Sequence, residues 1–206
     1  MKPIFVLLFF VTAGLITGVS ASSAYAADAS EKADYRVGDH LSSSSSPATA
    51  KTPYKEMKWE TLVPADWDPS KAFKDLDMNA LNDADPRATK FLQRLRDEWN
   101  NAPVDPKLNG ARIRIPGFIV PLESQHNDVT EFLLVPYFGA CIHVPPPPAN
   151  QIIHVFPAKP VKNGQTMDAV WVSGVLETVR SDTNMGNSGY QLKAEMVTPY
   201  KPQRKK

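Results

Sequence analysis

The chain has 206 residues, of which 23 are basic, 22 are acidic and 42% are hydrophobic. A formal net charge of +1 excludes the large positive field that steers proteins to nucleic acid or to anionic membrane surfaces. The length suits one domain with an extension. The single cysteine, Cys141, excludes an intrachain disulfide and leaves a free thiol, an intermolecular disulfide or a metal ligand.

Residues 1–26 have the pattern of a secretory signal peptide. Lys2 precedes an apolar run, and Ala24-Tyr25-Ala26 matches the small-residue cleavage pattern, which predicts cleavage before Ala27. An uncleaved membrane anchor is the alternative, but Gly, Ser and Thr dilute the second half of the run below the span that a membrane helix needs. We expect a periplasmic or secreted protein with no membrane span after signal removal.

The next two segments are predicted to be a flexible leader and an arm with one helix. Residues 27–52 contain five successive serines and few large apolar side chains, which is typical of disorder. Residues 53–110 contain tryptophans that we expect to pack on the main domain, followed by "DPRATKFLQRLRDEWNN". In this helix Asp85 is the predicted N-cap, and Phe91, Leu92, Leu95 and Trp99 form an apolar stripe.

From Ala111 to residue 200 the hydrophobic period changes to two. Five strand candidates follow one another: "ARIRIPGFIVPLE", "VTEFLLVPYF", "QIIHVFPA", "MDAVWVSGVLETVR" and "YQLKAEMVTPY". Gly117 and Gly174 interrupt strands at positions where bends let a sheet curl. The pattern predicts a mainly β protein with one N-terminal helix and a small five-stranded barrel of the oligonucleotide/oligosaccharide-binding (OB) type. An open sheet or a sandwich is the alternative, and residues 201–206 form a basic tail.

The loop "GACIHVPPPPANQIIHV" holds the candidate site. Cys141 and His143 are separated by one residue, so in extended backbone their side chains point to one side. The prolines that follow form a stiff strut, and His154 lies in the next strand. A thiolate and two imidazoles suit zinc, or copper, so Cys141, His143 and His154 are the predicted metal ligands. Asn150 and Gln151 are the predicted supporting residues.

Two other interpretations of the loop stay open. Cys141 could be a buried small hydrophobe in a structural turn, or His143 could activate it as a nucleophile. No second cysteine or orienting residue for the histidine completes a catalytic set. Aromatic side chains could also contact a ligand on the surface, namely Tyr137, Phe138 and Trp171.

The chain resembles the DUF3299 family of exported bacterial proteins, whose function is undefined. The similarity covers roughly residues 54–200 and rests on "WETLVPADWDP", "GFIVPLE" and "EFLLVPYFGACIHVPPPPANQ". The resemblance implies a small barrel, and family members encoded beside zinc-responsive transport components favour a metal-related role. It supplies no catalytic residues.

The sequence therefore predicts an exported, non-enzymatic accessory protein. It would bind zinc or assist a membrane transport assembly, or another exported protein, through the loop that contains Cys141, His143 and His154. The alternatives are a thiol-dependent enzyme that uses Cys141 and a protein-interaction module with a structural cysteine.

Overall fold

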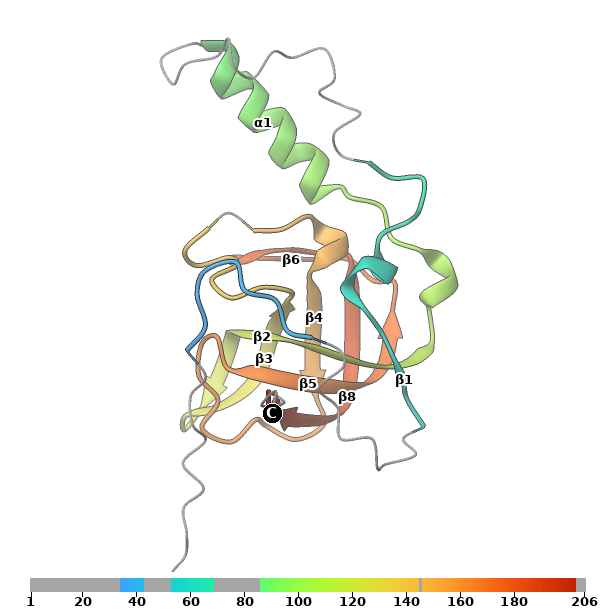
Figure 1. Ribbon diagram of the computed structural model, residues 1–206, viewed down its shortest axis with the longest axis vertical. Coiled ribbons are helices and arrows are strands. Elements are labelled where there is room, and N and C mark those ends of the chain that lie inside the picture. The colour runs from blue at the N-terminus through green and yellow to red at the C-terminus, as the bar shows by residue number, and fades with distance from the viewer. Residues whose placement is uncertain (1–33, 43–52, 69–85, 145, 203–206) are drawn as a thin grey trace, which may run out of the picture. The chain divides into compact units, whose positions relative to one another are not determined.

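The computed structural model describes residues 34–42, 53–68, 86–144 and 146–202 (Figure 1). Several predicted segments lie outside the described residues. They are the signal peptide, residues 27–33 and 43–52 of the leader, and the last four residues of the basic tail. The predicted N-cap Asp85 and the first proline of the strut, Pro145, also lie outside them.

The protein is mainly β, and five of its strands form a closed barrel. These strands are β2 (Ala111–Gln125), β3 (Asp128–Val135), β4 (Ile153–Pro157), β5 (Ala169–Glu177) and β8 (Tyr190–Pro199). Their order is β2-β3-β4-β8-β5, and pairing between β2 and β5 closes the barrel (Figure 1). Only the β4–β8 pair among these is parallel. This arrangement confirms the predicted OB-like barrel.

Strand β2 closes the barrel because it serves two neighbours. Its first half, from Ala111 to Phe118, pairs with β5, and its second half pairs with β3. The predicted bend at Pro116-Gly117 lies at the crossover between the two pairings. A side chain at position 117 has no room, because an added Cβ would lie 2.7 Å from the Leu134 side chain. Because Gly117 has no side chain, β2 can lie close to β3 at this bend.

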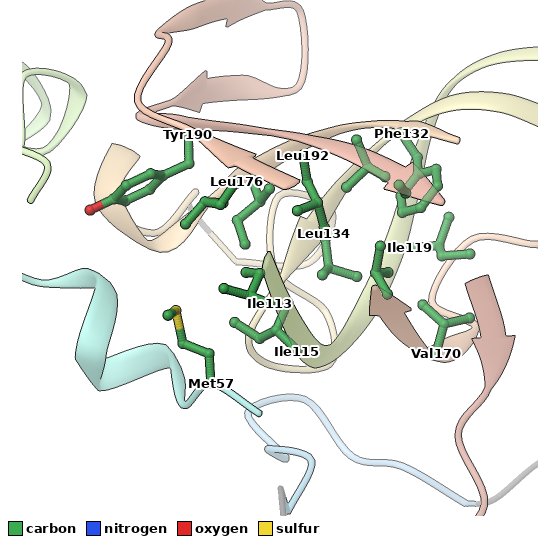
Figure 2. Packing of buried hydrophobic residues seen from close by; sticks show 14 of the residues in the cluster. Met57, Ile113, Ile115, Ile119, Phe132, Leu134, Val170, Leu176, Tyr190 and Leu192 are labelled. Carbon is green, nitrogen blue, oxygen red and sulfur yellow. The ribbon is translucent and has the colours of Figure 1, made fainter. Parts of the chain in front are cut away.

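Alternating residues fill the barrel interior, which is the main hydrophobic core (Figure 2). Side chains from all five barrel strands meet there, and Met57 joins them from the preceding arm. The fully buried members with the largest side chains include Phe132, Ile153 and Tyr190. The period of two in the sequence thus corresponds to inward-facing positions.

The tryptophan-containing arm covers one end of this core. Strand β1 (Lys55–Glu56) pairs in parallel with β2, and the 3-10 helix η2 (Trp59–Leu62) follows. Trp59 is buried, and its Nε1–H donates to the carbonyl oxygen of Pro116 over 2.7 Å. The Tyr190 hydroxyl donates to the carbonyl oxygen of Leu62 over 2.7 Å. The arm is therefore part of the folded domain.

Helix α1 (Pro86–Asn100) has the predicted position and a narrower apolar stripe than predicted. Phe91 is buried and Leu95 and Trp99 are half-buried, whereas Leu92 is 51% exposed. The spacing of four residues keeps the first three on one side, and Leu92 lies about 100° away from Phe91 around the helix. The guanidinium of Arg180 donates to carbonyl oxygens at the end of the helix.

Residues 34–42, which fall within the predicted flexible leader, pack on the barrel. Tyr35 and Leu41 contact an apolar cluster on its outer surface. These two side chains supply the apolar surface that the serine-rich residues around them lack. Among the residues described, no helix is long and apolar enough to cross a membrane.

Candidate functional site

The candidate functional site is the outer face of strands β3 and β4. These are the second and third barrel strands in chain order, and OB barrels bind ligands on that face and on neighbouring loops. Leu133 and His154 lie opposite each other in the register, and Leu133 belongs to the outer apolar cluster. The side chain of His154 is thus on the outer face, where Ile152 also lies.

A second hydrophobic cluster, which we call the outer cluster, covers part of this face. Its buried members come from β2, β3 and the loops between the strands. They are Phe118, Val120, Leu133, Val135, Ala140, Ile152 and Met167. Half-buried side chains, including Cys141 and Met185, pack around them. The barrel therefore has apolar packing on both sides of the β2–β3 sheet.

The loop between β3 and β4 begins with a tight turn built on Gly139. The carbonyl oxygen of Gly139 accepts hydrogen bonds from the amides of Ile142, His143 and Val144. Gly139 and Cys141 both have positive φ, 87° and 65°. A left-handed conformation is strained for a residue such as cysteine. The hydrogen bonds to one carbonyl hold that conformation in place.

Cys141, in the β3–β4 loop, lies close to the hairpin of β6 (Ser181–Thr183) and β7 (Gly186–Ser188). A Cβ added to Gly186 would lie 3.7 Å from Cys141 Sγ, 3.3 Å from Ile152 and 3.4 Å from Pro146. These apolar neighbours disfavour a charged sulfur. Burial raises the pKa of the Cys141 thiol from 9.0 to about 11. The sulfur is therefore a protonated thiol near neutral pH.

His154 pairs with an acidic residue of the neighbouring strand. Its Nε2–H donates to Glu131 Oε1 over 2.6 Å, since a carboxylate only accepts. The histidine side chain is 8% exposed and that of Glu131 is 26% exposed. His154 Nδ1 is buried and has no hydrogen-bond partner among the described residues. The Phe156 ring, 39% exposed, lies 4.3 Å from the histidine ring between centroids.

The three predicted metal ligands do not converge in this conformation. Cys141 and His143 share the Gly139 turn, and His143 is exposed. His154 lies on the outer face of the sheet, where Cys141 also packs, but its ring is hydrogen-bonded to Glu131. Across the described ranges, no three His, Cys, Asp or Glu side chains gather closely enough to hold a metal ion.

Asn150 and Gln151 anchor the loop to other segments of the chain. Both lie in the 3-10 helix η6 (Ala149–Gln151). Asn150 Nδ2 donates to the carbonyl oxygen of Pro103 over 3.0 Å, and Gln151 Nε2 donates to that of Trp59 over 2.9 Å. Each side chain holds a backbone carbonyl oxygen outside the loop, that of Gln151 in the arm and that of Asn150 in the segment after α1.

The three aromatic side chains predicted as surface contacts differ in their exposure. Tyr137 and Phe138 are half-buried at the edge of the outer cluster. Trp171 is only 3% exposed, because the guanidinium of Arg114 lies 4.2 Å from its ring centroid and the Tyr200 ring lies 5.8 Å away. Trp171 is thus covered and offers no open stacking surface.

Sequence reasoning missed two members of the candidate site, Glu131 and Phe156. The period of two in β4 carried a signal for Phe156 only. Phe156 shares the outward face with His154, two residues apart. Glu131 comes within hydrogen-bond distance of His154 only because β3 and β4 pair in this register, with Leu133 against His154. A single sequence does not specify that register.

The fold defines the chain as a small OB-type barrel protein, and the outer cluster covers part of the outer face of the barrel. The family model for DUF3299, described as proteins of unknown function, matches residues 59–199. The chain therefore belongs to the DUF3299 family. A crystal structure of a DUF3299 family protein from Pseudomonas aeruginosa PAO1 is 36% identical, with a TM-score of 0.59. The similarity covers 74% of this chain and 100% of that chain. No curated protein matches the chain.

Proposed function

We propose that this protein is an exported, non-enzymatic accessory protein that binds a partner protein on the outer face of β3 and β4. The partner would be a component of a membrane transport assembly or another exported protein. The export step rests on the signal-peptide pattern of residues 1–26.

One observation carries this proposal. The face that OB barrels use for ligands presents the exposed ring of Phe156 against the hydrogen-bonded pair of His154 and Glu131. A large aromatic ring on a rigid strand is the kind of side chain that anchors protein interfaces.

The state of Cys141 favours binding over catalysis. A nucleophilic cysteine needs a lowered pKa, usually through a nearby cation or a helix N-terminus. Here burial raises the pKa of the thiol to about 11. Only a small fraction of the sulfur would be thiolate near neutral pH, so a thiol-dependent enzyme is the weaker hypothesis.

Site-specific photo-crosslinking in the cells that produce the protein tests the proposed face. A photoreactive phenylalanine analogue replaces Phe156 in one variant and Met196 in the control. Met196 is similarly exposed, 43% against 39%, but lies on β8 where that strand pairs with β5. We expect one adduct of defined mass from position 156 and none from position 196. Adducts from both positions, or from neither, would contradict the proposal.

Zinc binding is the second candidate function. Cys141 and His143 lie on one turn, and His154, whose Nδ1 has no hydrogen-bond partner among the described residues, faces the same side of the sheet. Binding at this turn requires the thiol to lose its proton. Since the pKa of Cys141 is raised to about 11, zinc affinity should increase by up to roughly tenfold per pH unit below that value.

Calorimetric titration with zinc at pH 6.5 and pH 7.5 measures this dependence. Cys141→Ser removes the thiolate and His143→Ala removes the exposed imidazole, so each should weaken binding. His126→Ala serves as the control, because His126 is in the β2–β3 turn. Equal affinity in the wild-type protein and in both site variants would eliminate the metal hypothesis.

A further inference from the structure

Residues 34–42, which we call the strap, lie across the outer cluster in the way an added peptide strand would (blue in Figure 1). The amide of Gly38 donates to the carbonyl oxygen of Phe138 over 2.9 Å, and the amide of Phe138 donates to that of Asp39 over 2.9 Å. His40 forms an antiparallel bridge with Tyr137. The strap thus pairs through its backbone with Tyr137 and Phe138, which follow the end of β3.

One aromatic ring of the strap fills an aromatic socket. The ring of Tyr35 lies 5.1 Å from that of Phe118, edge to face, and 6.0 Å from that of Phe138, stacked. Phe118 and Phe138 also contact each other, at 5.6 Å. Backbone pairing together with a socket for one side chain is the recognition mode of proteins that bind extended peptides by strand addition.

The strap fits this socket imperfectly. The Tyr35 hydroxyl is buried and has no hydrogen-bond partner among the described residues. Burying a hydroxyl without a partner opposes binding. Val37 is 54% exposed, so the middle of the strap contributes little burial. A phenylalanine ring in the same socket would keep the ring contacts and avoid the unsatisfied hydroxyl.

We propose that the strap is an intramolecular occupant of a peptide-binding face, and that an extended partner segment carrying a phenylalanine displaces it. This inference rests on the proposed protein-binding role for the existence of the partner. The strap and Phe156 lie on the same side of the β3–β4 sheet.

The order of peptide affinities in the wild-type protein and three variants of the full chain tests the proposal. The probe is a fluorescent peptide with the sequence of residues 33–42 in which phenylalanine replaces the tyrosine. Tyr35→Ala weakens the strap, so this variant should bind the probe at least roughly tenfold more tightly than the wild-type protein. Tyr35→Phe strengthens the strap and should bind it more weakly than the wild-type protein. Arg36 is an exposed residue of the strap, so Arg36→Ala should bind the probe with the same affinity as the wild-type protein.

Hydrogen exchange gives a second readout that does not depend on the probe. In Tyr35→Ala the amides of Gly38 and Phe138 should exchange roughly tenfold faster, while the amides of β3 keep their protection. Loss of protection throughout β3 would mean that the strap is an integral part of the fold, and would overturn the proposal.

Two further outcomes would also overturn it. One is equal probe affinity in all four proteins, and the other is concentration-dependent dimers of Tyr35→Ala, which would identify a second copy as the occupant. Crosslinking at Phe156 does not involve the strap, so failure of this inference and failure of the proposed function give different results.

Discussion

At the residue scale, the protonation of Cys141 determines which chemistry the loop can support. Burial raises the pKa of the thiol from 9.0 to about 11, and only the thiolate reacts with alkylating agents. At pH 8 the folded protein should therefore react with iodoacetamide roughly 100-fold more slowly than an unperturbed thiol. The rate should rise with pH up to about 11.

The alkylation rate is measured by mass spectrometry between pH 7 and pH 11. The same chain in concentrated urea is the matched control, because unfolding removes the apolar neighbours of the sulfur. A native rate at pH 8 that equals the rate in urea would show that the sulfur is not shielded. A native rate that exceeds it would restore the nucleophilic interpretation of Cys141.

The pair of His154 and Glu131 is the second feature that a residue-level experiment can resolve. A hydrogen bond of 2.6 Å to a largely buried imidazole should couple the two side chains by about 1–3 kcal/mol. The measurement is a double-mutant cycle on the free energy of unfolding with His154→Gln and Glu131→Gln.

Glu177 and Lys193 are the control pair for that cycle. Their charged atoms are also 2.6 Å apart, but the lysine side chain is 67% exposed. Solvent screening should limit their coupling to about 0–1 kcal/mol. If the two cycles gave equal coupling energies, burial would not strengthen the histidine pair.

The sequence predicted the composition of the candidate loop better than its geometry. The spacing of Cys141 and His143 predicted extended backbone with both side chains on one side. Both residues lie instead in a turn, in which Cys141 has a φ of 65° and is half-buried while His143 is exposed. The partner of His154 depends on strand register, and the burial of Cys141 depends on a hairpin more than 40 residues away in the chain. Such long-range contacts leave no signal in local spacing.

At the scale of elements, the strands of the barrel and the helix follow from local patterns, whereas the short elements do not. All five barrel strands overlap the predicted segments, because a half-buried strand imposes its period on the sequence. Strand β1 has two residues, and β6 and β7 have three each. Segments of that length are too short to show any period.

The arm that contains η2 illustrates how an irregular segment can be part of the core. Leu62 is fully buried at the end of the barrel, with the Tyr190 hydroxyl bound to its carbonyl oxygen. Leu62→Ala leaves a cavity there and should lower the free energy of unfolding by about 2–5 kcal/mol. Urea denaturation followed by tryptophan fluorescence measures the change.

The exposed residue Glu60 of the same 3-10 helix provides the control. Glu60→Ala keeps the backbone turn and should change the free energy of unfolding by no more than about 0.5 kcal/mol. Equal effects of the two substitutions would mean that the arm is not packed on the barrel.

At the scale of the whole molecule, closure of the barrel also depends on strand β5, which pairs with two neighbours along most of its length. Strand β5 pairs with β2 on one side and with β8 on the other, and the register with β8 shifts between Ser173 and Gly174. The sequence indicated a bend at Gly174. It did not indicate that Gly174 lies between two other strands, opposite Ile113 of β2 and Ala194 of β8.

The close approach of β8 at Gly174 leads to the most demanding prediction. A Cβ added at this position would lie 2.1 Å from the carbonyl oxygen of Lys193 and 2.8 Å from the Cα of Ala194. Both atoms are backbone, so relief would require β8 to move away from β5. Gly174→Ala should therefore destabilise the protein by about 4 kcal/mol or more, or prevent folding.

The neighbouring substitution Ser173→Ala is the matched control, because Ser173 is also buried in β5 and already carries a Cβ. It should cost no more than about 1.5 kcal/mol. Thermal unfolding by circular dichroism compares the two variants under the same conditions. A Gly174→Ala protein that melts cooperatively at the temperature of Ser173→Ala would show that β5 and β8 can separate at the bulge, and closure of the barrel would then not depend on their contact at this point.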